Sequence, residues 1–258
     1  MKKGIFLKAV FCFNIVTGTI FSGPRMKHNT SAPDFLILGV TKCGTTSLYD
    51  YIVKHPKILG SKKKELHFFT TYYKRGSAWY RRQFPVKKSH DQLIGEATPG
   101  YFWKKDCDKK ILKHSPTTKF IVIFRNPVKR IVSEYFRLQQ RGEEVLDFDH
   151  AIARPDLQDR YIGAGLYSEH LERWLSQVPR NQILVLILED VAQDPEREVN
   201  KVFAFLGLQE FKLDSYALRN QAKYDMGEIN SETIEALKKL YAPYNKKLEK
   251  ILGRALPW

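Results

Sequence analysis

The sequence predicts an α/β fold: a three-layer sandwich around a mainly parallel sheet, with a P-loop-like anion-binding loop. The chief observation is that short apolar runs, typical of strands buried on both faces, alternate with stretches of helical character. The first of these runs also leads directly into a loop that contains glycine. The composition agrees, since 258 residues with 43% hydrophobic and 28% charged side chains suit one ordinary globular domain.

Three apolar runs predict the strands, at residues 34–40, 119–124 and 183–188. The first helix is expected over 47–55, because Pro56 follows it, and the second over 128–141, because Pro127 suits a first helical turn. Amphipathic patterns predict further helices at 166–177, 194–206 and 231–252. No repeat and no linker interrupts residues 34–258, so we expect a single domain there.

Residues 1–33 form a separate N-terminal segment in this prediction. Two lysines follow Met1, and an apolar stretch then runs from residue 5 to 21 with interruptions at Lys8 and Asn14. This pattern suits either a signal-like segment or a short amphipathic helix that packs on the domain. It is too short and too interrupted for a stable membrane span, which needs about 20 apolar residues.

The chain is strongly basic, with 43 Lys and Arg against 28 Asp and Glu and a formal net charge of +15. Much of the excess lies in residues 61–90, where nine Lys and Arg accompany a single acidic residue, Glu65. Such a field attracts polyanions: nucleic acid, anionic lipid, acidic polysaccharide or phosphorylated small molecules.

The three cysteines, Cys12, Cys43 and Cys107, are odd in number and far apart. They exclude a disulfide-stapled secreted fold, and no cysteine or histidine spacing suggests a zinc site, so no metal is expected. The lack of cysteine pairs suits a reducing compartment. We therefore expect a cytoplasmic protein, with the Golgi lumen or membrane association through residues 1–23 as the alternative.

The loop after the first strand has the spacing of a nucleoside-triphosphate loop, with Gly39 and Gly44 separated by four residues. That loop requires lysine directly after its second glycine, whereas Thr45 and Thr46 stand here and the lysine is Lys42. A phosphate site is predicted, because backbone N–H groups at a helix N-terminus bind anions, but not a kinase or ATPase.

A second anion site is predicted after the second strand. Arg125 stands where ligands of open α/β sheets bind, and Ser133 follows about two helical turns later. A ligand that touches both loops would carry two separate phosphate groups.

Four motifs in order now make a family resemblance apparent. Residues 38–48 resemble the 5′-phosphosulfate loop of the sulfotransferases, and residues 123–135 resemble their 3′-phosphate motif. Residues 64–69 and 96–102 are similar to segments of the heparan-sulfate (glucosamine 3-O/N-) sulfotransferases and their bacterial relatives, as is 244–248 near the carboxyl end.

The resemblance implies an enzyme that moves the sulfuryl group of 3′-phosphoadenosine 5′-phosphosulfate (PAPS) to a hydroxyl or amine of a carbohydrate by in-line transfer, without metal. Lys42 would neutralise charge on the bridging oxygen, Glu65 would be the general base, and His67 would orient the glutamate or the acceptor. PAPS itself would be held at the 5′ side by Lys42, Cys43, Gly44, Thr45, Thr46 and Ser47, and at the 3′ side by Arg125 and Ser133.

The sequence departs from the animal 3-O-sulfotransferases at three places. Ala97 and Thr46 stand where that subgroup has a substrate-contacting lysine and an arginine, and residues 218–227 lack its disulfide-bearing loop. Within residues 218–227, the candidates to complete the PAPS site are Arg219, Asn220 and Lys223.

An anionic or neutral carbohydrate is the expected acceptor, and no nucleic-acid partner is expected. Sulfation of a small alcohol or lipid is the alternative. A non-enzymatic polyanion-binding domain is a remoter one, and no oligomeric state is predicted.

Overall fold

The computed structural model describes residues 33–217 and 229–258, which lie within one unit, Ser31–Trp258. Nearly all of the predicted N-terminal segment, residues 1–32, falls outside the described residues. So do the three candidates Arg219, Asn220 and Lys223.

In the described residues, five strands form one fully parallel sheet: β1 (Phe35–Ile37), β2 (Ile58–Gly60), β3 (Leu93–Ala97), β4 (Lys119–Phe124) and β5 (Ile183–Ile187). Their order is β2-β3-β1-β4-β5. The predicted α/β class and parallel sheet are confirmed. The prediction of three strands was incomplete, because β2 and β3 were not anticipated.

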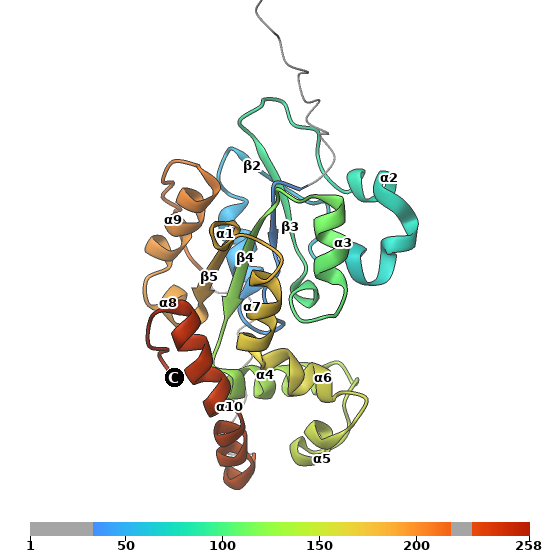
Figure 1. Cartoon of the computed structure of the whole chain (residues 1–258), viewed down its shortest axis with the longest axis vertical. Helices are drawn as coiled ribbons and strands as arrows, with labels where there is room; N and C mark the ends of the chain where they lie inside the picture. Colours follow the sequence, from blue (N-terminus) through green and yellow to red (C-terminus); the bar gives the residue numbers. More distant parts are fainter. Residues whose placement is uncertain (1–32, 218–228) are drawn as a thin grey trace, which may run out of the picture. The chain divides into compact units, whose positions relative to one another are not determined.

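Helices cover both faces of the sheet (Figure 1). Helices α1 (Thr45–Ile52) and α9 (Pro195–Leu206) pack together on one face. The other face is covered by α3 (Cys107–His114) and α7 (Tyr167–Leu175). On that face, Trp174 of α7 is fully buried with its ring 4.9 Å from that of Phe120. These layers explain why the strand residues are almost all apolar.

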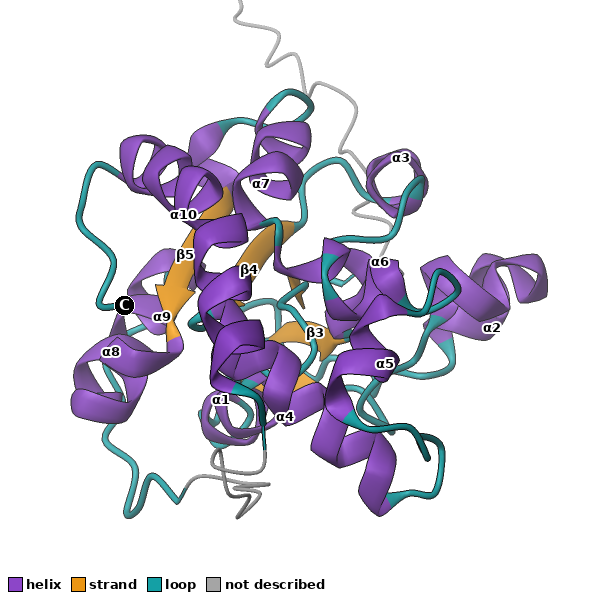
Figure 2. Ribbon diagram, turned by 90° about the horizontal axis from the view of Figure 1, so that it is seen from below, coloured by secondary structure: helices purple, strands orange, loops and turns teal. Residues whose placement is uncertain are grey.

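A second group of helices lies over the carboxyl ends of the strands (Figure 2). It comprises α4 (Pro127–Gln140), α5 (Phe148–Ala153), α6 (Gln158–Tyr161) and α10 (Ser231–Leu252), which share their own hydrophobic cluster. The two remaining α-helices of the described residues are short: α2 (Gly76–Arg81) and α8 (Leu188–Gln193). No helix within residues 33–217 and 229–258 is both long and apolar enough to cross a membrane.

The connections diverge at the middle of the sheet. After β1 the chain passes through α1 to β2 on one side, whereas after β4 it passes through α4 to β5 on the other. In open α/β sheets such a divergence opens a crevice at the carboxyl ends of the two central strands. The two predicted anion-binding loops follow these two strands.

Candidate functional site

A cavity of about 840 Å³ lies at this crevice. It is lined by the loop after β1, the turn around Glu65, the segment after β3, and helix α4. Of the residues predicted for the site, it brings together Lys42, Gly44, Thr45, Thr46, Ser47, Glu65, His67, Arg125 and Ser133. Cys43 is the one predicted PAPS-binding residue within residues 33–217 that does not line it.

The loop after β1 turns through two residues with left-handed backbone, Lys42 at φ 70° and Gly44 at φ 86°. A side chain at Gly44 would also displace Leu188, since an added Cβ would lie 2.5 Å from Leu188 Cδ1. The N-cap residue of α1 is Gly44, which has no side chain to cap the first turn. The first turn of α1, Thr45 to Ser47, lines the cavity. Backbone N–H groups at the start of a helix are suited to bind an anion.

Cys43 points the other way. Its side chain is fully buried, with Sγ 3.6 Å from the hydroxyl of Tyr167. Burial raises the pKa of this thiol to about 11. Its backbone N–H already donates to the carbonyl of Val40. Cys43 thus supports the loop from the core side, and its thiol does not reach the cavity.

The two predicted anion-binding loops contact each other. Arg125 Nη1 donates a hydrogen bond of 3.2 Å to the carbonyl oxygen of Lys42, and the Arg125 carbonyl accepts one of 2.9 Å from Tyr167. Asn126 caps α4 by accepting from the N–H groups of Val128 and Lys129. This cap starts the helix that carries Ser133 to the cavity.

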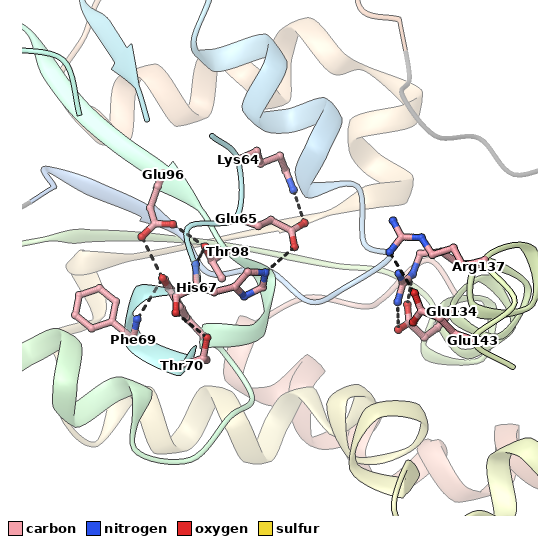
Figure 3. A network of polar contacts seen from close by, with 12 residues as sticks. Lys64, Glu65, His67, Phe69, Thr70, Glu96, Thr98, Glu134, Arg137 and Glu143 are labelled. Carbon is pink, nitrogen blue, oxygen red and sulfur yellow. Dashed lines mark hydrogen bonds and ion pairs between the residues drawn. The ribbon is translucent and has the colours of Figure 1, made fainter. Parts of the chain in front are cut away.

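Glu65 and His67 form a pair on a tight turn before the π-helical turn Phe68–Tyr72. Glu65 Oε1 accepts a 2.7 Å hydrogen bond from Lys64, and its Oε2 lies 3.4 Å from His67 Nε2 (Figure 3). The hydrogen bond from His67, supported by the Lys64 charge, lowers the pKa of Glu65 to about 2. The carboxylate is therefore ionised at neutral pH.

Sequence reasoning missed a buried ion-pair cluster on the cavity wall. Glu134, whose side chain is inaccessible to solvent, receives two hydrogen bonds from Arg137 (2.7 and 3.0 Å) and one from Arg160 (2.7 Å). Burial alone would raise the pKa of Glu134, but the two arginines outweigh it and lower the pKa. Figure 3 shows Glu134 and Arg137 across from the Glu65–His67 pair.

A helical spacing could have revealed part of this cluster. Ser133 and Arg137 on one face of α4, and Arg141 at its C-cap, recur every four residues, and all three line the cavity. Arg160 comes from the separate helix α6, and no local pattern places it here.

The cavity is electrostatically prepared for anions. Burial lowers the pKa of Lys42, and the nearby charges of Arg137, Arg125 and Arg141 add to this effect, while Glu134 opposes it. Cations gathered in a half-buried space repel one another, and an anionic ligand relieves that repulsion. Within the described residues, no group of three or more His, Cys, Asp or Glu side chains could hold a metal ion.

The chain resembles known proteins along most of its length. The sequence model of the family described as "Sulfotransferase domain" matches residues 32–226. Mouse heparan sulfate glucosamine 3-O-sulfotransferase 6 is 31% identical over 268 residues, covering 93% of this chain and 76% of that protein. Human heparan sulfate glucosamine 3-O-sulfotransferase 3B1 is 30% identical, with 93% and 67% coverage.

The structure is also similar to solved sulfotransferase structures. A sulfotransferase from Alicyclobacillus acidocaldarius superposes with a TM-score of 0.75 at 28% identity, covering 87% of this chain and 97% of that one. Mouse sulfotransferase SULT7A1, crystallised with PAP, has the same fold at a TM-score of 0.59 and 14% identity, with 86% and 87% coverage.

Proposed function

The chain belongs to the sulfotransferase family, and from that premise we propose that it transfers the sulfuryl group of PAPS to a hydroxyl group of a carbohydrate. One observation carries the proposal. Two anion-binding loops, one with Lys42 and one with Arg125, meet in a cavity that also contains a paired carboxylate, Glu65.

The two loops supply a site for each phosphate of the donor. The N–H groups at the start of α1, with Thr45, Thr46 and Ser47, suit the 5′-phosphosulfate. Arg125 and Ser133 suit the 3′-phosphate, because guanidinium and hydroxyl groups both donate to phosphate oxygens.

In the proposed reaction, the acceptor oxygen forms a bond to sulfur while the bond from sulfur to the bridging phosphate oxygen breaks. Adenosine 3′,5′-bisphosphate leaves, and the acceptor's proton passes to Glu65. Lys42 stabilises the negative charge that grows on the bridging oxygen, as in loose phosphoryl transfer. General-base assistance of this kind contributes about 10²–10⁴-fold.

The low pKa of Glu65 bears on this role. A carboxylate with a pKa of about 2 is ionised but is a weak base while both Lys64 and His67 hold it. An acceptor hydroxyl that takes the place of one of these partners would raise the pKa of Glu65 and strengthen it as a base. His67 then orients the carboxylate or the acceptor.

An acidic polysaccharide is the acceptor that the cavity suits best. Arg137, Arg141 and Arg160 line it in addition to the residues of the two loops, and they suit the carboxylate or sulfate groups of a sugar chain. The mouse and human relatives are named for heparan sulfate, which we propose as the first acceptor to test.

Calorimetric titration tests the donor assignment. We expect the protein to bind adenosine 3′,5′-bisphosphate tightly and ATP much more weakly. Arg125→Ala should lose most of the bisphosphate affinity. The control is Arg197→Ala, which removes an exposed arginine of α9 that does not line the cavity. Preference for ATP, or equal binding by both variants, would contradict the proposal.

A further inference from the structure

A second glutamate lies beneath the Glu65 turn, and the proposed mechanism leaves it unused. Glu96, on β3, is completely buried, and both oxygens of its carboxylate accept hydrogen bonds. Its Oε1 accepts hydrogen bonds from Tyr80 (2.6 Å) and Tyr101 (3.2 Å), and its Oε2 accepts one from Thr98 (2.6 Å). A buried carboxylate with three hydroxyl donors is costly to assemble, so its surroundings merit a functional explanation.

Two of these hydroxyls, those of Thr98 and Tyr101, also accept hydrogen bonds from the turn that carries Glu65 and His67. The backbone N–H of His67 donates to Thr98 Oγ1 at 3.5 Å, and that of Phe69 donates to the Tyr101 hydroxyl at 3.4 Å (Figure 3). The N–H of Glu65 donates to the carbonyl of Ala97, the residue after Glu96. The Glu96 carboxylate itself also accepts a hydrogen bond from the backbone N–H of Leu66. The segment that begins at Glu96 therefore satisfies several N–H groups along the turn.

The turn needs such support because its backbone is unfavourable. Glu65 has φ 64° and His67 has φ 51°, and neither is a glycine. Left-handed conformation at such residues costs energy and persists only where surrounding contacts impose it.

The chemistry of a carboxylate gives these contacts a direction. A hydroxyl has one hydrogen, and an ionised carboxylate only accepts. When Thr98 and Tyr101 give their hydrogens to Glu96, their oxygens are left with lone pairs that face the N–H groups of His67 and Phe69. Burial raises the pKa of Glu96, and the donors from Thr98 and Tyr80 work against that rise.

We infer that Glu96 is a positioning residue: through the hydroxyls of Thr98 and Tyr101 it fixes the left-handed turn that aims Glu65 and His67 into the cavity. This inference rests on the proposed role of Glu65. Glu96 is not among the residues that line the cavity.

The substitutions that test this inference change the Thr98 hydroxyl and the Glu96 carboxylate separately. Thr98→Val removes the hydroxyl that joins Glu96 to His67, and Thr98→Ser restores it. Glu96→Gln keeps the shape but replaces one accepting oxygen with a donating amide. Tyr80→Phe is the matched control, because it deletes a hydroxyl that donates to Glu96 while its ring stays stacked on Phe68.

The first readout needs no substrate: the pKa of Glu65 in the free protein, followed by NMR of its side-chain carboxyl. It is about 2 because His67 and Lys64 are held against it. In Thr98→Val and Glu96→Gln we expect it to rise toward the ordinary glutamate value of about 4.3. Thr98→Ser and Tyr80→Phe should stay close to the parent protein. If Glu96→Gln does not fold, the two Thr98 variants decide the question.

The second readout is turnover with heparan sulfate as acceptor, beside calorimetric affinity for adenosine 3′,5′-bisphosphate. We expect kcat to fall at least tenfold in Thr98→Val, with bisphosphate affinity changed by less than about twofold and with recovery in Thr98→Ser. An unchanged Glu65 pKa in folded Thr98→Val, or an equal rise in Tyr80→Phe, would overturn the inference. Absence of sulfation by the parent protein would instead count against the proposed function, and the NMR result would stand apart from it.

Discussion

Backbone strain is concentrated at individual residues of the site. Among the described residues, the non-glycine positions with positive φ are Lys42, Glu65, His67 and Asp106. The first three line the cavity, and each has a proposed chemical role. A residue in this conformation costs on the order of 1–3 kcal/mol and is typically found where function requires a particular side-chain direction. The positions that the sequence motifs single out are therefore those where local preference is overruled.

The lowered pKa of Lys42 predicts how donor binding depends on pH. Burial lowers the pKa of Lys42, so it loses its proton below the usual lysine range. The charged form of Lys42 attracts phosphate. Affinity for adenosine 3′,5′-bisphosphate should therefore fall as the pH rises through the lowered pKa of Lys42, which lies below the ordinary lysine value of 10.5. Calorimetry between pH 7 and pH 10 measures this.

The control for this dependence is Lys42→Met. It should bind more weakly at pH 7, and its affinity should be nearly constant over the same range. A parent protein whose affinity declines no more than that of Lys42→Met over this range would contradict the assignment of Lys42 to the bound phosphates.

At the scale of elements, strands β1, β4 and β5 and the long helices were predictable because each has an uninterrupted apolar run or a clear helical period. Strands β2 and β3 were not, for physical reasons. β2 is three residues long, and β3 contains Gly95 and Glu96, whose polar side chain resembles a surface residue until its buried partners are known. Glu96, one of the two residues that hide β3 from prediction, is also the residue that we infer to support the Glu65 turn.

Helix α4 allows a test of how its start supports the site. Asn126 accepts from the N–H groups of Val128 and Lys129, so Asn126→Ala should destabilise the protein by about 1 kcal/mol. For a chain of this size, that is a fall in Tm of about 2–4 °C. Asn126→Asp retains an accepting oxygen and should stay near the parent Tm. Equal melting of all three proteins would show that the cap contributes nothing.

For the whole molecule, topology and charge combine at one place. The strand order brings the ends of β1 and β4 together, and a chain of net charge +15 gathers Lys42, Arg125 and Arg137 around the resulting cavity. Motif order indicated the two loops and Glu65 from the sequence. The helical spacing of α4 could have indicated Arg137. The pairing of Glu134 with Arg160 could not be predicted, since it joins α4 to α6 through tertiary packing.

The central claim is that this cavity transfers a sulfuryl group with Glu65 as the base. The most direct measurement is transfer of radiolabelled sulfate from PAPS to heparan sulfate by the parent protein and by Glu65→Gln, with Glu169→Gln as a control. Glu169 is an exposed glutamate on α7 that pairs with Lys247, outside the cavity.

We predict labelled polysaccharide from the parent protein and from the control. Glu65→Gln should lose at least a hundredfold in rate with its affinity for adenosine 3′,5′-bisphosphate intact. A Glu65→Gln protein that retains more than a few per cent of the parent rate would contradict the account.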